Sequence, residues 1–330
     1  MKRRWSITAL FLLVGSYLCI SQAALIAYDP FVNANVGSGE NDALNGEYNA
    51  GTQFRDFTNG SNEDVAGGSI VGWSSANLWI GNSGSSAGTN DKLIGPTDLT
   101  GLSYGNNSVQ GGNVQARGKT TTAGTVSYAR RPLDSYTGSS VYYISALFSA
   151  DTSTINNNFT INAMTGFTAS TSSGAFDGSS FVGALFGFHG DGSEVDLVVR
   201  HRDTTGTTIN STLLNGVSGD TTYFVVLKLE YNADGTNERL TAWVNPQSST
   251  ESGSTPVLTT TGQMLSSETQ MTLAGFWINN FDSSATDYLQ FDELRMGTEW
   301  LDAVAVPEPG TIGLFVISSV GLFFVRHIQR

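Results

Sequence analysis

A serine flanked by glycines is the first feature of this sequence that could perform chemistry. Gly101-Leu102-Ser103-Tyr104-Gly105 matches the Gly-x-Ser-x-Gly pattern of a nucleophile elbow, in which a sharp turn presents a serine Oγ to the substrate. The elbow requires a helix after the serine, and residues 106–112 are Asn, Ser, Gly and other turn formers that would not build one. We therefore interpret Ser103 as a loop residue.

Side chains that bind metals are few. Between the two termini the chain has two histidines, His189 and His201, and no cysteine, so a zinc site would depend on carboxylates. His201 follows Arg200 at a strand end and His189 precedes a Gly-Asp-Gly turn, which predicts that both lie at the surface. One acidic segment supplies the hard oxygen ligands that calcium prefers and leaves calcium open as a ligand: Asp282, Asp287, Asp292 and Glu293. We expect no other cofactor.

The elements that would position these residues are β-strands. The chain has 38 Gly against 7 Pro, and 14% of its residues are charged, which favours short strands and tight turns over a helical bundle or a disordered polyelectrolyte. Runs of β-branched and aromatic residues predict strands at 141–148, 181–188, 195–199, 223–229, 240–244, 273–278 and 289–294. Residues 231–238 contain Asp-Gly and predict a hairpin connection rather than a calcium loop. Residues 37–124, which are poorer in apolar runs, predict edge strands and surface loops.

Residues 1–23 have the three parts of a secretory signal peptide. Three basic residues at positions 2–4 precede an apolar run over 7–20, and Ser21-Gln22-Ala23 provides a cleavage site after Ala23. The one cysteine, Cys19, lies in this segment and follows Leu18, where a lipoprotein signal needs a small residue. The sequence predicts an exported mature chain that has no cysteine and is stabilised by its own core.

Residues 306–330 combine a proline motif, an apolar segment and a basic end. Val306-Pro307-Glu308-Pro309 keeps the backbone extended, because proline fixes φ and lacks an N–H donor, and this exposes Glu308 to a processing enzyme. Residues 311–325 would form a hydrophobic helix of about 22 Å, shorter than the ~30 Å hydrocarbon core of a bilayer. Arg326 and Arg330 stay cytoplasmic under the positive-inside rule, which places the preceding chain outside the inner membrane.

This tail resembles that of the PEP-CTERM sorting-domain proteins in the order, spacing and terminal position of its three parts. The resemblance covers residues 306–330. It implies processing by an exosortase, an integral-membrane transpeptidase-like enzyme of bacteria that make exopolysaccharide. The protein would then be associated with the inner membrane during sorting and reside at the cell surface or in the extracellular matrix. An ordinary C-terminal membrane anchor is the alternative.

Charge limits the partners of residues 24–305, which we call the body. The body has 11 of the 16 basic and 28 of the 29 acidic residues, a net charge of −17. Such a surface repels nucleic acid and anionic lipid headgroups, so we expect neither as a partner. Neutral glycans, or acidic glycans bridged by cations, stay open as ligands. Solubility of an exported protein would also account for the charge.

Several segments of the body resemble the concanavalin A-like, laminin-G-like jelly roll. They are Tyr28-Asp29-Pro30-Phe31, residues 128–133, the strand pair 223–231 and 239–245, and Phe291-Asp292-Glu293-Leu294-Arg295-Met296-Gly297. The resemblance implies an all-β jelly-roll β-sandwich over residues 24–305, flanked by the signal peptide and the C-terminal hydrophobic helix. We see no linker or repeat that would divide the body.

The same fold includes laminarinase-type glucanases, whose acid and nucleophile lie on one strand as Glu-x-Asp-x-x-Glu. Glu194 and Asp196 match the first two positions, but Val199 replaces the final carboxylate and cannot donate a proton. The mechanism therefore fails at this site, and we expect Glu194 and Asp196 on the solvent face of a strand.

Exposed aromatic side chains would mark a glycan-binding module, because sugar rings stack on Trp and Tyr. The mature chain has Trp73, Trp79, Trp243, Trp277 and Trp300, and core burial is the default expectation for them. We predict a non-enzymatic exported protein without catalytic residues, whose β-sandwich is structural or binds extracellular polysaccharide. The alternative is a polysaccharide-active enzyme that uses carboxylates between Asp282 and Glu293.

Overall fold

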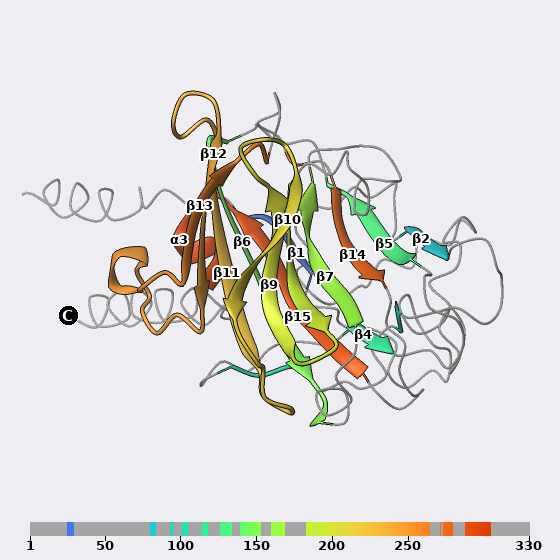
Figure 1. Ribbon diagram of the computed structural model, residues 1–330. Coiled ribbons are helices and arrows are strands. Elements are labelled where there is room, and N and C mark those ends of the chain that lie inside the picture. Colours follow the sequence, from blue (N-terminus) through green and yellow to red (C-terminus); the bar gives the residue numbers. More distant parts are fainter. Residues whose placement is uncertain are drawn as a thin grey trace, which may run out of the picture.

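The computed structural model describes the strands, the two short helices and most of the second half of the chain. The described residues are 25–29, 80–83, 93–94, 101–104, 114–117, 126–133, 139–152, 160–168, 183–264, 271, 273–279 and 288–304. They confirm the prediction of an all-β body, since they form strands β1 to β15 in two antiparallel sheets (Figure 1).

The first sheet combines the last strands of the chain with one from the middle. Its order is β13 (Leu258–Gly262), β12 (Glu238–Val244), β11 (Tyr223–Glu230), β6 (Val141–Ala150), β15 (Tyr288–Gly297), β4 (Val114–Arg117) and β3 (Leu93–Ile94). The first described strand, β1 (Leu25–Asp29), pairs with β15, so the two ends of the body lie side by side.

The second sheet has the order β10 (Thr208–Leu214), β9 (Val195–Arg202), β8 (Gly183–Asp191), β7 (Thr160–Thr168), β14 (Leu273–Asn279), β5 (Val126–Pro132) and β2 (Ile80–Ser83). All seven strands predicted from the sequence are present. Three strands from the middle and second half of the chain, β7, β10 and β13, were not predicted, because Thr, Asn, Ser and Gly interrupt their apolar residues.

Phenylalanine rings join the two sheets. The ring of Phe148 on β6 lies 5.3 Å from that of Phe186 and 5.8 Å from that of Phe188, both on β8. Phe291 on β15 completes the cluster, with Phe148 at 5.6 Å and Phe276 of β14 at 5.4 Å. All five side chains are buried, so these strands turn one set of alternate residues into the core and the other set outward.

Three glycines lie where the pairing of β7 and β8 leaves no room for a side chain. Gly166, Gly183 and Gly187 have φ angles of +152°, +146° and +152°. A Cβ atom at Gly187 would lie 2.3 Å from the carbonyl oxygen of Ala163, and one at Gly166 would lie 2.2 Å from that of Ala184. These positions therefore require glycine for both conformation and space.

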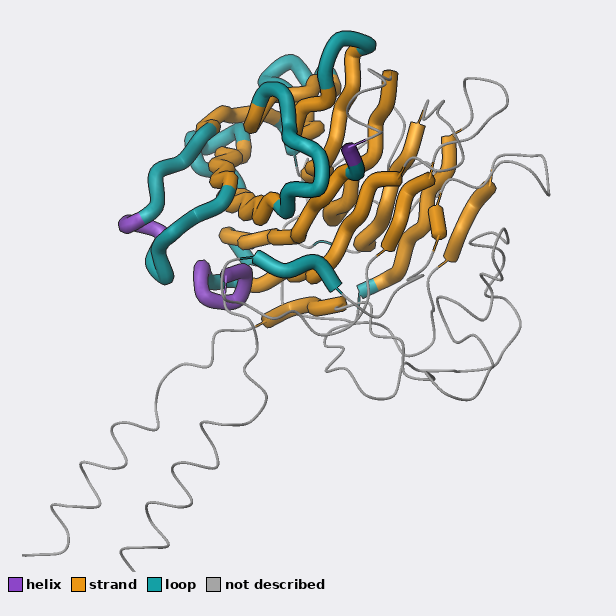
Figure 2. Tube along the Cα trace, turned by 90° about the horizontal axis from the view of Figure 1, so that it is seen from below, coloured by secondary structure: helices purple, strands orange, loops and turns teal. Residues whose placement is uncertain are grey.

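The outer face of the first sheet is covered by the chain itself. Helix α3 (Trp300–Val304) lies outside the strand layers (Figure 2), and the Trp300 ring packs edge-on against Trp243 at 4.9 Å and Tyr143 at 6.2 Å. The Ser145 hydroxyl donates to the carbonyl oxygen of Ala303 at 2.7 Å. Together these contacts build a second, smaller apolar cluster on this face.

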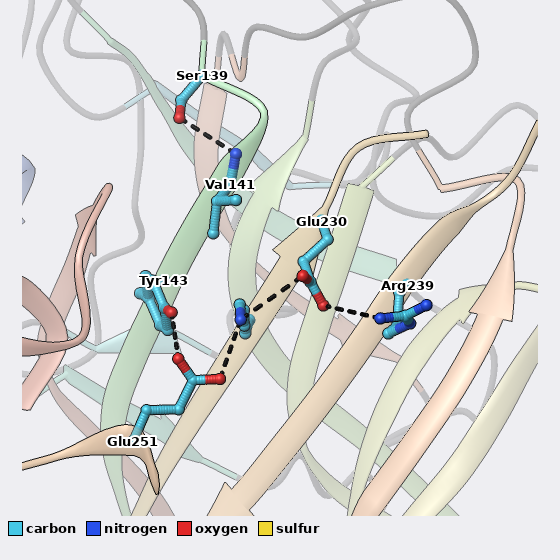
Figure 3. Close-up of polar contacts among 7 residues, drawn as sticks. Ser139, Val141, Tyr143, Glu230, Arg239 and Glu251 are labelled. Carbon is cyan, nitrogen blue, oxygen red and sulfur yellow. Dashed lines mark hydrogen bonds and ion pairs between the residues drawn. The ribbon is translucent and has the colours of Figure 1, made fainter. Parts of the chain in front are cut away.

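A polar network beside α3 holds the loop that contains the helix η1 (Glu251–Gly253) (Figure 3). Glu251 accepts hydrogen bonds from the Tyr143 hydroxyl at 2.5 Å and from Lys228 Nζ at 2.9 Å. Glu230 lies 3.6 Å from Lys228 Nζ and 3.8 Å from Arg239 Nη1. Burial and the neighbouring Glu251 raise the pKa of Tyr143, which keeps its hydroxyl a donor.

The predicted hairpin between β11 and β12 is confirmed. Asp234 accepts hydrogen bonds from the backbone N–H groups of Asn237 at 2.6 Å and Thr236 at 3.0 Å. These bonds lower the pKa of Asp234 to about 2. Asn232 and Gly235 take positive φ angles of 54° and 89° in the same turn. The Asp234 carboxylate therefore closes the turn, as an Asx residue does.

The glycines between β7 and β8 yield the first prediction. Gly187→Ala should lower the free energy of unfolding by about 2 kcal/mol or more, because the methyl group meets the neighbouring backbone and the φ angle disfavours alanine. Chemical denaturation of the variant measures the change. Gly235→Ala is the matched control, since Gly235 also has a positive φ but has nothing within 4 Å of the added Cβ. Equal losses in the two variants would contradict the close approach of β7 and β8.

Candidate functional site

The outer face of the second sheet is set by the residues that its strands bury. On β8, Ala184, Phe186 and Phe188 belong to the core, so Gly187 and His189 point outward. On β9, Val195, Leu197 and Val199 belong to the core, which turns Asp196, Val198 and Arg200 outward. The register then determines which outward residues become neighbours.

Three polar side chains lie in a row across this face. Asp196 of β9 is the Cα partner of His189 on β8, and His189 is the partner of Asn162 on β7. The row continues to the backbone position of Asn279 on β14. All three side chains are half-buried, so each reaches solvent. We call Asp196, His189 and Asn162 the polar row.

Hydrogen bonds define what the polar row can offer. His189 Nδ1 lies 2.9 Å from Asn162 Oδ1. In the neutral tautomer that carries its proton on Nδ1, the ring donates this bond to Oδ1 and Nε2 is an acceptor. Asp196 Oδ1 accepts from the backbone N–H of Gly216 at 2.8 Å. Asp196 Oδ2, His189 Nε2 and Asn162 Nδ2 bond to no described residue, and they provide two acceptors and one donor over about 10 Å, given the ~4.8 Å spacing of strands.

A buried row lies next to the polar row. Val198, Gly187, Met164 and Trp277 are successive Cα partners on β9, β8, β7 and β14. The Arg200 guanidinium lies 4.8 Å from the centre of the Trp277 ring, within the range of a cation–π contact. Trp277 Nε1 has no hydrogen-bond partner among the described residues. These residues flank the polar row on one side.

The tryptophans do not form an exposed stacking surface in the described part of the chain. Trp243 and Trp277 are each 2% exposed and Trp300 is 6% exposed, which confirms the expectation of core burial for these three. Trp73 and Trp79 lie outside the described residues. The three described tryptophans therefore offer no face on which a sugar ring could stack.

The prediction that both histidines lie at the surface is wrong for His201, which is fully buried. Strand β9 extends to Arg202, beyond its predicted end, and carries His201 on the core side of the sheet, where it is the Cα partner of Ile209 on β10. His201 Nδ1 lies 3.1 Å from the carbonyl oxygen of Arg202, and Nε2 lies 2.9 Å from Ser211 Oγ. Burial lowers the pKa of His201, so the ring is neutral and both nitrogens are occupied.

The acidic residues considered for calcium are structural where the structure describes them. Asp292 and Glu293 are buried at a β-bulge of β15, and Glu293 has a positive φ of 54°. Asp292 accepts from the backbone N–H of Leu102 at 2.7 Å. Glu293 accepts from the Tyr28 hydroxyl at 3.1 Å and pairs with Arg295. Both carboxylates thus bind the protein itself.

The remaining part of that cluster, Asp282 and Asp287, lies outside the described residues. Within the residues that are described, no group of three or more His, Asp or Glu side chains is arranged to hold a metal ion.

The other candidate sites behave as predicted where they are described. Glu194 is exposed and Asp196 faces outward, while Val199 is buried in the core. The third position of the glucanase pattern therefore points away from the first two. Ser103 is exposed in a short extended segment, residues 101–104, beside the bulge of β15.

Both segments predicted to direct targeting lie outside the described residues. They are the predicted signal peptide with cleavage after Ala23, and the predicted sorting tail with Val306, Pro307, Glu308, Pro309 and Arg326. The described part begins at Leu25 and ends at Val304. It contains no helix that is both long enough and apolar enough to cross a membrane.

Comparisons with known proteins identify no family. No protein family model matches the chain, and no curated sequence does. Among solved structures, the globular domain of T. cruzi calreticulin matches at a TM-score of 0.40 and 10% identity, covering 67% of this chain and 86% of that one. The carbohydrate recognition domain of Emp47p matches at 0.39 and 9% identity, covering 63% and 95%. Alginate lyase Aly36B matches at 0.36 and 13% identity, covering 56% and 80%.

These comparisons correct one expectation. The prediction that the protein is not an enzyme is wrong. The solved structures that this chain matches include alginate lyase Aly36B and a carbohydrate esterase of bacteriophage phi24B. The neighbours comprise both carbohydrate-binding domains and enzymes that act on carbohydrates.

The burial of His201 generates a prediction about pH. An unfolded histidine titrates near pKa 6.5, whereas the folded pKa is lower, so protons bind the unfolded chain more readily. The free energy of unfolding should therefore fall as pH decreases below 6.5. Denaturation at a series of pH values from 8 to 5 measures this, and His201→Gln, which keeps a hydrogen-bonding side chain, should flatten the dependence in that range. An identical pH dependence in the wild type and His201→Gln would show that His201 does not cause it.

Proposed function

We propose that this protein is an exported cell-surface or matrix protein whose body binds polysaccharide through the polar row on its second sheet. The observation that carries the proposal is the alignment of the half-buried side chains Asp196, His189 and Asn162 on three adjacent strands. The body would be a concanavalin A-like jelly roll, as the sequence resemblance implies. A jelly roll has two antiparallel sheets in which strands distant in the sequence pair with each other, and the strand orders of this protein have that character.

The groups of the polar row suit a ligand rich in hydroxyl groups. A carboxylate oxygen and an imidazole nitrogen accept hydrogen bonds, and a carboxamide nitrogen donates them. A sugar hydroxyl can satisfy either kind of group, because it both donates and accepts. The row spans about 10 Å along the direction of strand pairing, so it favours an extended chain over a single small molecule.

The other outer face is less suited to a ligand. Helix α3 and the loop around Glu251 already cover the first sheet, and Glu251, Lys228, Glu230 and Arg239 bond to one another there. A ligand on that face would have to displace contacts that the chain makes with itself. The net charge of −17 on the body further favours a neutral glycan, or an acidic one bridged by cations.

The sorting route is the second part of the proposal. It is supported by the sequence alone: the signal peptide ending at Ala23, and the tail formed by Val306-Pro307-Glu308-Pro309, residues 311–325 and Arg326. An exosortase-type enzyme would process the tail at the membrane. Export through the inner membrane would bring the body to the compartment that contains extracellular polysaccharide.

The polysaccharide proposal predicts the effect of three substitutions. His189→Ala, Asn162→Ala and Asp196→Ala should each weaken retardation in affinity electrophoresis about tenfold, as expected for one lost hydrogen bond to a ligand. The gels contain neutral or acidic polysaccharides, with calcium or with chelator. Arg239→Ala is the matched control, because Arg239 is exposed on the first sheet, away from the polar row.

Either of two results would reject the site. One is undiminished retardation of a variant that carries all three substitutions. The other is a loss of retardation in Arg239→Ala as large as in the three single variants. Product formation from any polymer, measured in the same samples, would identify an enzyme and would be traced with the same three variants.

The sorting proposal predicts the fate of the C-terminus. An epitope placed after Arg330 should be lost from the mature wild-type protein, whereas Glu308→Ala with Pro307→Ala should retain it in the membrane fraction. Immunoblotting of membrane and extracellular fractions with this epitope and a second one in the body measures the outcome. Thr311→Ser is the control, since it leaves the Pro-Glu-Pro motif intact. Retention of the epitope on the wild-type protein would instead favour the ordinary membrane anchor.

A further inference from the structure

The edge of the second sheet is formed by β10, a strand with one described neighbour. Residues Thr208–Leu214 pair with β9 on one side, and β10 ends the strand order of its sheet. The other side of an edge strand presents backbone N–H and C=O groups that another strand can bind. The register with β9 is regular from Thr208 to Thr212 and shifts only after Thr212, so five residues form a straight edge.

This edge lacks the charges that usually keep edge strands apart. Residues 208–214 contain no Lys, Arg, Asp, Glu or Pro, although the body as a whole has a net charge of −17. Asn210 and Thr212 are exposed, so the side chains near the edge are accessible. An uncharged edge strand lets two copies of this acidic chain approach with less repulsion than a charged one.

The sequence of the edge is also complementary to itself. When two copies of β10 pair antiparallel about Asn210, Thr208 of each copy faces Thr212 of the other, and Asn210 faces Asn210. These three positions alternate with Ile209 and Ser211 and share the outer face with Arg200 of β9. Thr–Thr pairs stabilise neighbouring strands, and a carboxamide both donates and accepts, so Asn210 can bond to its own copy.

We propose that the protein forms a two-fold symmetric dimer in which β10 pairs antiparallel with β10 of a second copy, with Asn210 at the axis. The second sheet then continues from one copy into the other. The polar rows of the two copies lie on the same continuous face. A polymer that reaches both rows would bind with the advantage of two linked sites, although the dimer itself does not depend on polysaccharide binding.

Cysteine cross-linking tests the register directly. In a full-length chain with Cys19→Ser, Asn210→Cys would place two thiols on directly opposed residues, whose Cα atoms lie about 4.5–5.5 Å apart in an antiparallel pair and fit a disulfide. Thr259→Cys is the control, because Thr259 is exposed on β13 at the edge of the first sheet. After mild oxidation, the disulfide-linked dimer of Asn210→Cys should exceed that of Thr259→Cys about tenfold. Equal cross-linking of the two variants would overturn the proposal.

A charge at the axis tests the dimer without cross-linking. Asn210→Lys would oppose two ammonium groups, so sedimentation should show a dimer for the wild type and a monomer for the variant at about 0.15 M salt, where long-range repulsion is screened. Thermal unfolding verifies that the variant folds, and Asn210→Gln should keep the dimer. A monomeric wild type at all salt concentrations, or an unchanged dimer in Asn210→Lys, would refute the pairing. Both measurements are made without polysaccharide, so their failure leaves the proposed binding site to its own test.

Discussion

The contact of Phe148 with Phe186 and Phe188 across the two sheets is the interaction on which the rest of the structure depends. It joins the middle strand of one layer to the middle of the other, and Phe291 and Phe276 extend it along both sheets. Because side chains alternate along a strand, burying Phe186 and Phe188 obliges Gly187 and His189 to face outward. The composition of the candidate site is therefore a consequence of core packing.

Glycine then sets how closely the outward residues can lie. Gly166, Gly183 and Gly187 allow β7 and β8 to approach at positions where a Cβ atom would meet a carbonyl oxygen. They also leave the neighbouring surface without side chains, so Met164 and Trp277 can pack beside the polar row. The 2.9 Å bond between His189 and Asn162 spans these same two strands.

The two outer faces differ in how the chain uses them. On the first sheet, Trp243, Trp300 and Tyr143 form a second apolar cluster, and Glu251 binds Tyr143 and Lys228 beside it. Buried acidic side chains elsewhere also bind other parts of the protein. Glu293, for example, accepts a hydrogen bond from Tyr28 and pairs with Arg295. On the second sheet, the polar row retains acceptors and a donor that no described residue engages. We therefore place the proposed ligand site at the polar row.

The sequence by itself determined the β class, seven strands, the Asp234 hairpin and the failure of the glucanase pattern, because these depend on alternation and turn residues that are local in the chain. It did not find β7 or β10, whose Thr, Asn and Ser residues become strands only by pairing with β8 and β9.

Nor could the sequence bring Asp196, His189 and Asn162 together, because the register of three strands places them side by side although no spacing links them. His201 was predicted at the surface, and the tertiary structure buries it, because β10, whose Ser211 bonds its ring, pairs with β9 only in the folded chain. The sequence shows the local alternation of apolar and polar residues. Strand pairing between distant segments determines which faces meet, and that pairing exists only in the folded chain.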